Sequence, residues 1–145
     1  MGNLKELYLR AIDAYNAHDL DRFISYYADE CDVTVPGFPP FRGKAAVREC
    51  WRLFMESFPD DHLTVINQVV EGASMVGEWT AEATNTGALY LPSGQVLPPT
   101  GRRFTNRGID ISTVEADRVK SHRLYWDTTA VLAQLGLLPE SVPVQ

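Results

Sequence analysis

The sequence contains little cysteine and little histidine. Cys31 and Cys50 are its two cysteines, and their spacing fits no metal motif. The three histidines, His18, His62 and His122, lie too far apart to suggest a local metal motif. We therefore expect reduced cysteines, no metal and no cofactor.

The signals of several other protein classes are also absent. There is no glycine-rich phosphate loop, dinucleotide fingerprint or nucleophile elbow. A formal net charge of -6 provides no basic surface for phosphates, which argues against a nucleic-acid partner. No segment approaches the roughly 18 apolar residues of a membrane span, and the amphipathic start MGNLKELYLR is unlike a signal peptide. We expect a soluble, cytoplasmic protein without a membrane partner.

What the sequence does contain is enough apolar material for a core. Hydrophobic residues make up 45% of 145 residues, which is typical of a globular chain. We expect a single domain over residues 1–138, followed by a loose C-terminal tail over 139–145.

Hydrophobic spacing changes along the chain from a helical period to a strand period. Helices are expected over 3–17, after the N-cap Asp19, after Gly43, and over 128–135. Strands are expected over 31–35, 63–70, 75–86, 104–114 and 118–127. Segregated helices followed by an antiparallel meander predict an α+β fold with helices on one face of a sheet.

Several short sequence segments, in their order along the chain, resemble the SnoaL-like polyketide cyclases of the NTF2-like superfamily. They are AYNAHDLDRFISYYADE (14–30), PFRGKAAVRECWRLFMESFPD (40–60), TNTG (84–87), PPTGRRF (98–104), RGIDI (107–111) and HRLYWD…QLG (122–136). The resemblance implies a cone, in which helices pack on a strongly curved, mostly antiparallel sheet that encloses a pocket. It also implies cofactor-free ring closure by intramolecular aldol condensation, although relatives include isomerases, dehydratases, epoxide hydrolases and binding-only domains.

Asp127 matches the acid/base carboxylate of that family, near the end of the last strand. In an apolar cavity a carboxylate can take a proton beside a carbonyl and return it to the developing alkoxide. The other interpretation is a helix N-cap, because Asp is a favoured cap and Thr128 begins a helix. We expect a catalytic Asp127, with capping as the alternative or an additional role.

Strand alternation puts Ser121, Arg123, Tyr125 and Asp127 on one face of the last strand. Tyr125 is therefore a candidate substrate-binding residue. His122 falls on the opposite face, where we expect it to contact solvent or a dimer partner rather than the cavity.

Other candidate substrate-binding residues lie outside the last strand. Asn85 replaces a His that many relatives carry before Thr-Gly, and it could instead be a turn residue. Asn106 and Asp110 share one strand face, but we favour a solvated position for Asp110. Tyr15 and Trp51 could line the cavity mouth, although ordinary core packing is the better interpretation.

The loop over 87–101 combines Pro and Gly residues with exposed apolar side chains. It is either a lid or dimer contact, or a plain β-hairpin with Ser93-Gly94 at its turn.

Three functions follow in order of preference. The first is a cyclase, expected to be a homodimer, that acts on a small apolar oxygenated molecule through Asp127. The second is an isomerase, dehydratase or epoxide hydrolase on the same scaffold. The third is a non-catalytic binding or dimerisation module, which predicts a filled pocket and an Asp127 that bonds the amides of Thr129 or Ala130 and faces no cavity.

Overall fold

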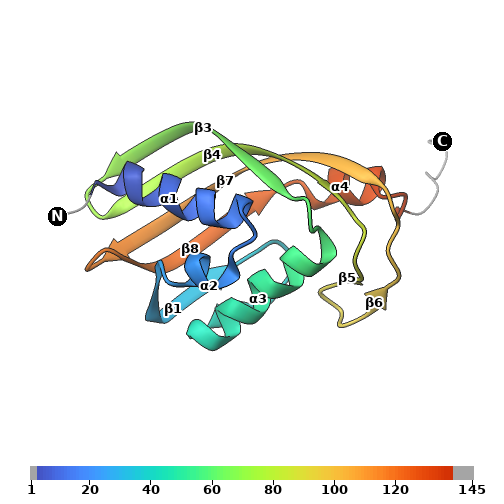
Figure 1. Cartoon of the computed structure of the whole chain (residues 1–145), viewed down its shortest axis with the longest axis horizontal. Helices are drawn as coiled ribbons and strands as arrows, with labels where there is room; N and C mark the ends of the chain where they lie inside the picture. Colours follow the sequence, from blue (N-terminus) through green and yellow to red (C-terminus); the bar gives the residue numbers. More distant parts are fainter. Residues whose placement is uncertain (1–2, 139–145) are drawn as a thin grey trace, which may run out of the picture.

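The computed structural model describes residues 3–138, and one large sheet connects most of its elements (Figure 1). The helices are α1 (Leu4–Asn16), α2 (Leu20–Ile24), α3 (Lys44–Ser57) and α4 (Thr128–Gln134). The strands are β1 (Tyr27–Thr34), β2 (Phe41–Arg42), β3 (His62–Glu71), β4 (Ser74–Thr84), β5 (Leu89–Tyr90), β6 (Val96–Leu97), β7 (Arg103–Glu115) and β8 (Arg118–Trp126).

Six strands form the large sheet in the order β2-β1-β8-β7-β4-β3. The pairs β3–β4, β4–β7 and β7–β8 are antiparallel, as the meander predicts, whereas β1 and β8 run parallel. The sheet curves but does not close, because β2 and β3 form its two edges. The expected α+β cone, with helices against a curved and mostly antiparallel sheet, is confirmed.

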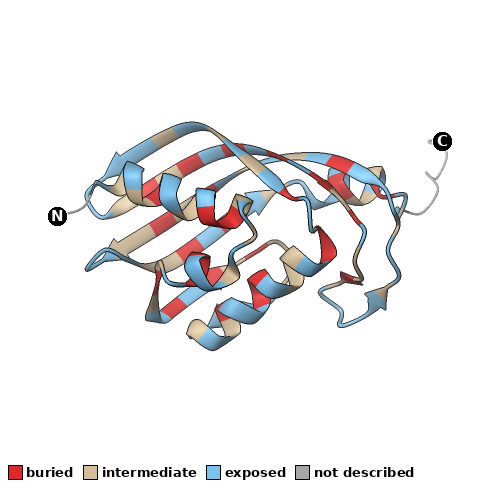
Figure 2. Cartoon of the chain, in the orientation of Figure 1, coloured by how far each residue is buried: buried red, intermediate tan, exposed pale blue. Residues whose placement is uncertain are grey.

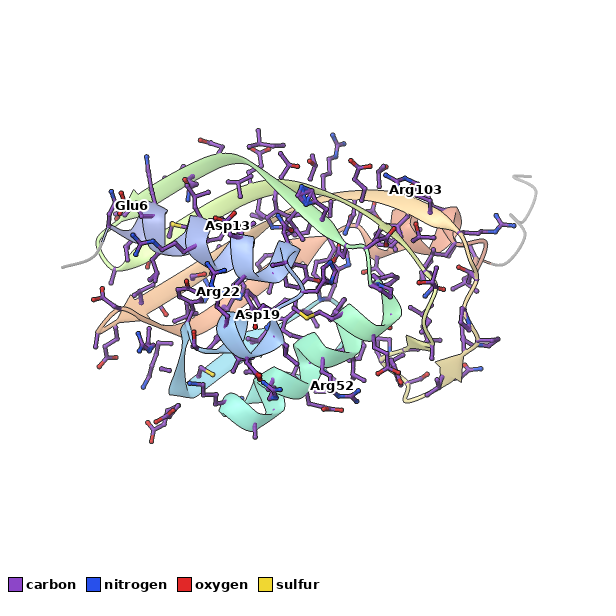
Figure 3. The ribbon with its side chains drawn as sticks, in the orientation of Figure 1. Glu6, Asp13, Asp19, Arg22, Arg52 and Arg103 are labelled. Carbon is purple, nitrogen blue, oxygen red and sulfur yellow. The ribbon has the colours of Figure 1, made fainter. Side chains whose placement is uncertain are left out.

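Helices α1, α2 and α3 lie along the concave side of the sheet (Figure 1). Each helix turns its apolar residues inward, so buried positions gather between helices and sheet (Figure 2). Arg52 lies on the opposite side of α3, where it bonds Glu49 and Glu56 (Figure 3). This amphipathic arrangement places the core between the two layers.

Most predicted elements are confirmed within two residues. Asp19 caps α2 by accepting from the Arg22 amide, and Gly136 follows α4 with a positive φ of 75°. The predicted strand 31–35 is wrong at its start, because β1 begins at Tyr27 and its parallel pairing with β8 includes that residue. The expected tail over 139–145 lies outside the described residues.

The convex face of the sheet carries several exposed apolar side chains, namely Ile66, Val69, Ile109 and Tyr125. The homodimer expected from the sequence stays a prediction. Among the helices between residues 3 and 138, none is both long enough and apolar enough to cross a membrane.

Candidate functional site

A cavity of about 160 Å³ lies between the helices and the concave face of the sheet. Its walls are mainly aromatic and aliphatic, and they come from α1, α3, α4, the β5–β6 hairpin and the central strands. The polar or ionisable side chains in the lining are those of Tyr15, Cys50, Trp51, Ser57, Asp61, Trp79, Tyr90, Asn106, Asp110, His122, Trp126 and Thr128. No lysine or arginine of the described residues belongs to the lining.

Asp61 supplies one of the two carboxylates in this cavity. Its side chain is buried, with 8% of the residue exposed, and Oδ2 accepts a 2.7 Å hydrogen bond from the Tyr15 hydroxyl. Oδ1 has no hydrogen-bond partner among the described residues. Burial raises the pKa of Asp61 to about 6, and the bond from Tyr15 opposes that rise. Asp61 therefore has one anchored oxygen and one free oxygen.

The position of Asp61 depends on how α1 meets β3. Asn16, the last residue of α1, donates to the Leu63 carbonyl at 2.9 Å and accepts from the Leu63 amide at 2.8 Å. This double hydrogen bond fixes the end of α1 against the start of β3, so Tyr15 meets Asp61. The neighbouring Asp60 turns away and accepts from the Thr84 amide.

Asp110 supplies the second carboxylate, and it is 2% exposed. Its Oδ1 accepts from the Tyr8 hydroxyl at 2.9 Å, and its Oδ2 lies 2.6 Å from His122 Nε2. The other ring nitrogen of His122 lies 2.6 Å from the Tyr27 hydroxyl, which accepts from Trp51 Nε1 at 3.1 Å. These five side chains form one buried network.

One arrangement of protons satisfies every bond in this network. The indole of Trp51 can only donate to the Tyr27 oxygen, the Tyr27 hydroxyl can donate to His122 Nδ1, and His122 can donate from Nε2 to Asp110. Burial raises the pKa of Tyr27 well above its usual value, which keeps that hydroxyl protonated. The network therefore needs Asp110 as its acceptor.

A glycine in β4 makes room for this arrangement. A Cβ on Gly77 would lie 2.3 Å from the Tyr8 hydroxyl and 2.7 Å from Asp110 Oδ1. Gly77 is also the residue directly opposite Asp110 in the β4–β7 pair. Any larger residue would push Tyr8 and Asp110 apart.

Cys50 supplies a thiol to the cavity lining. Burial raises the pKa of its thiol to about 12, so it stays protonated and unreactive near neutral pH. The part of the chain that the structure describes contains no group of three His, Cys, Asp or Glu residues placed to hold a metal ion.

Asp127 does not point into the cavity. It is exposed, and its Oδ1 accepts from the Ala130 amide at 3.0 Å, which makes it the N-cap of α4. The expectation that its carboxylate lies in the cavity is therefore wrong, because the strand ends one residue earlier and the side chain turns back to the helix amides. The hypothesis of a non-catalytic module predicts this hydrogen bond. The same hypothesis also predicts a pocket filled by side chains, whereas the structure has a cavity.

The sequence pattern groups the residues of β8 correctly into two faces, but the expectation of which face turns toward the cavity is wrong. His122, Leu124 and Trp126 line the cavity, whereas Tyr125 is 49% exposed on the convex side. The predictions of a substrate-contacting Tyr125 and of an outward His122 are both wrong. The inward set is the more apolar one apart from His122, which is the signal that favours the observed orientation.

Asn85 is buried but does not line the cavity. Its amide nitrogen donates to the carbonyls of Ser57 and Gly87, and its oxygen accepts from the amide and hydroxyl of Thr100. All of its hydrogen-bonding capacity is used to hold the loop against α3. The expected contact between Asn85 and a substrate carbonyl is wrong for this reason.

The other four candidates do lie in the cavity wall. They are Tyr15, Trp51, Asn106 and Asp110. Asp110 is buried, so the favoured solvated position is wrong. Tyr15 and Trp51 are both core residues and lining residues, since each is 4% exposed. Their roles toward a substrate stay predictions.

Sequence reasoning missed Asp61 altogether. Asp60 and Asp61 follow the end of α3, and nothing local distinguishes the buried acid from the exposed one. The partner Tyr15 lies 46 residues away. Only the packing of α1 on β3 reveals the pair.

The segment 87–101 contains the hairpin of β5 and β6. Leu89, Tyr90, Leu91 and Pro92 belong to the cavity lining. The hairpin interpretation is confirmed, and the same residues cover one side of the cavity, beside the end of α3 (Figure 1).

Comparison with solved structures gives several similar folds. TsrD from Streptomyces laurentii is 27% identical, with a TM-score of 0.78 and coverage of 93% of this chain and 96% of that chain. IdmH from Streptomyces antibioticus is 25% identical, with a TM-score of 0.76 and coverage of 93% and 99%. SalBIII, an epoxide hydrolase/cyclase-like enzyme of pyran ring formation in salinomycin, is 20% identical, with a TM-score of 0.72 and coverage of 87% and 92%.

Comparison with curated proteins gave no match. The family profile described as SnoaL-like polyketide cyclase matches residues 5–135, which is nearly the whole chain. The resemblance noted in the sequence is thus confirmed: the chain belongs to the SnoaL-like polyketide cyclase family.

Proposed function

We propose that this protein catalyses intramolecular aldol-type ring closure, or a related proton transfer, on a small apolar oxygenated molecule, with Asp61 as the acid/base. The observation that carries the proposal is a buried carboxylate with one free oxygen in an apolar cavity and a pKa near 6. Family membership supports the reaction class.

The chemistry requires a group that both accepts and returns a proton. Above about pH 6 Asp61 is ionised, and its free Oδ1 can take the proton from the carbon next to a carbonyl. After the enolate carbon bonds to a second carbonyl, the protonated Asp61 can return the proton to the new alkoxide. A pKa near the working pH suits both steps.

Tyr15 acts on Asp61 as a positioning residue. Burial raises the pKa of Tyr15 well above its usual value, with the negative charge of Asp61 as the next cause, so its hydroxyl stays protonated and donates throughout. The bond to Oδ2 fixes the carboxylate and leaves Oδ1 without a hydrogen-bond partner among the described residues.

The hydrolytic alternative requires a second carboxylate that can hold water. Asp110 lines the cavity, but both of its oxygens are engaged by Tyr8 and His122. This arrangement supports proton transfer over hydrolysis. Solvent oxygen-18 in the product would instead favour an epoxide hydrolase.

The test uses 2-indanone, a compact apolar ketone with acidic benzylic protons, as a probe of the enolisation step. We expect the protein to accelerate exchange of these protons in D2O, measured by proton NMR, and Asp61→Asn to lower that acceleration by at least about 100-fold. Asp127→Asn serves as the matched control and should keep the wild-type rate. Equal rates for Asp61→Asn and wild type would refute the proposal.

A further inference from the structure

A second buried polar atom without a hydrogen-bond partner belongs to Trp79, a residue of the cavity lining. In the part of the chain that the structure describes, the buried side-chain nitrogen and oxygen atoms that lack a hydrogen bond are Trp79 Nε1 and Asp61 Oδ1. Both residues line the same cavity. An indole N–H can only donate, and buried donors are rarely left unpaired, so this atom lacks an acceptor that a ligand can supply.

Trp79 is fixed in place by its surroundings. It is 3% exposed and lies on the concave face of β4, directly opposite Gly108 of β7. A Cβ on Gly108 would lie 2.9 Å from the Trp79 ring atoms Cζ2 and Cη2, so the missing side chain accommodates the ring. The ring also packs edge-on against Trp126, with centroids 6.3 Å apart. The donor is therefore preorganised rather than free to turn away.

The lining restricts what the acceptor can be. Among residues 3–138, no lysine or arginine belongs to the cavity lining, whereas Asp61 and Asp110 do. A carboxylate or phosphate group on the ligand would find no counter-charge and, above about pH 6, would be repelled by the ionised Asp61. A neutral carbonyl oxygen meets neither obstacle and accepts from an indole N–H.

We propose that Trp79 Nε1–H is the donor for the carbonyl oxygen of a neutral, enolisable ketone, on which negative charge develops as Asp61 removes the adjacent proton. This inference rests on the proposed function and specifies its substrate class. The carbon–hydrogen electron pair becomes the enolate double bond, and the carbonyl π pair moves to oxygen. Trp79 keeps its proton and stabilises that oxygen by hydrogen bonding.

Binding tests the donor separately from catalysis. We expect wild-type protein to bind 2-indanone about tenfold more tightly than indane, its hydrocarbon counterpart, because only the ketone supplies an acceptor. Trp79→Phe keeps an aromatic ring but lacks the N–H, and it should bind the two probes equally. It should also slow proton exchange by about 10- to 100-fold without moving the pH midpoint set by Asp61.

Indole NMR tests the same contact even if Trp79→Phe fails to fold. In protein labelled with 15N-tryptophan, the Trp79 Nε1–H signal should move downfield on addition of 2-indanone but not of indane. Assignment can use Trp51→Phe and Trp126→Phe to identify the other two signals. An unmoved Trp79 signal, a retained ketone preference in Trp79→Phe, or no binding of 2-indanone to wild type would each overturn the inference.

Asp61→Asn distinguishes the two proposals. This variant should lose proton exchange yet keep the downfield shift at Trp79, since ketone binding needs no base. Retained exchange in Asp61→Asn would refute the proposed function while a shift at Trp79 would still support the donor. Loss of exchange together with an unmoved Trp79 signal would support Asp61 as the acid/base and refute Trp79 as the donor.

Discussion

The two buried carboxylates of the cavity differ in how completely they are bonded. Asp110 accepts from Tyr8 and His122 and ends a network that extends to Trp51. Asp61 accepts one side-chain hydrogen bond, from Tyr15, and its Oδ1 has no partner among the described residues. Fully bonded carboxylates rigidify a core, whereas a partly bonded one retains reactivity at a cost in stability. The same cavity thus contains a structural acid and a candidate catalytic acid.

Removal of Asp110 should have the largest effect on stability. Asp110→Ala leaves the buried donors of Tyr8 and His122 without an acceptor, so we expect a loss of about 3 kcal/mol or more in the free energy of unfolding. Tyr8→Phe removes one donor and should cost about 1 kcal/mol. Urea denaturation measures both. Similar small losses for the two variants would mean that the network is not the structural element described above.

Asp61 should show the opposite behaviour, because its charge opposes folding at neutral pH. Its pKa rises on folding from an ordinary value of 3.8 to about 6, so its contribution favours the fold at low pH and is lost as pH rises through about 6. The loss amounts to about 3 kcal/mol.

Asp61→Asn removes this titration while it keeps an acceptor for Tyr15. Relative to wild type, the variant should gain roughly 3 kcal/mol between about pH 3.5 and pH 7.5, as measured by urea denaturation across that range. A stability difference that does not change with pH would contradict a raised pKa at Asp61.

Tyr15→Phe should sharpen the comparison through the pH profile. The bond from Tyr15 lowers the pKa of Asp61, so its loss should move the midpoint of 2-indanone exchange upward from about 6 by on the order of one unit. Tyr8→Phe, at the other carboxylate, should leave that midpoint in place. A downward shift in Tyr15→Phe would contradict the assigned role.

The smallest expected effect belongs to Asp127. Asp127→Ala removes the N-cap of α4 and should cost about 1 kcal/mol in the free energy of unfolding. The exchange rate per folded molecule should not change, because the carboxylate is exposed and outside the cavity. A large loss of exchange at constant stability would restore Asp127 as a catalytic candidate.

Local patterns in the sequence predicted most of the fold but only part of the site. The helical spacing of Val47, Cys50 and Trp51 and the cap at Asp19 depend on neighbours within one or two turns, so they can be read directly. Alternation separated the two faces of β8, but it does not say which face turns inward. The apolar Leu124 and Trp126 favour the observed inward face, but the buried position of His122 depends on Tyr27, a partner 95 residues away.

The candidate acid could not be identified for a related reason. Asp60 and Asp61 are adjacent and chemically identical, yet one bonds the Thr84 amide and the other bonds Tyr15. Their difference is set by contacts 24 and 46 residues away. Family position instead indicated Asp127, whose capping geometry was foreseeable from Thr128 and the helix that follows.

The parallel pairing of β1 with β8 has a consequence for synthesis of the chain. Strand β8 lies between β1 and β7, so the early strands β1 and β2, which pair with each other, have no link to the rest of the sheet until residues near 118–126 have been made. During translation, β1 can pair with β8 only after almost the entire polypeptide has left the ribosome. Premature termination before Arg118 would accordingly release a product that lacks β8. The edges of β1 and β7 that β8 normally pairs would then be exposed, and such unpaired edges promote aggregation.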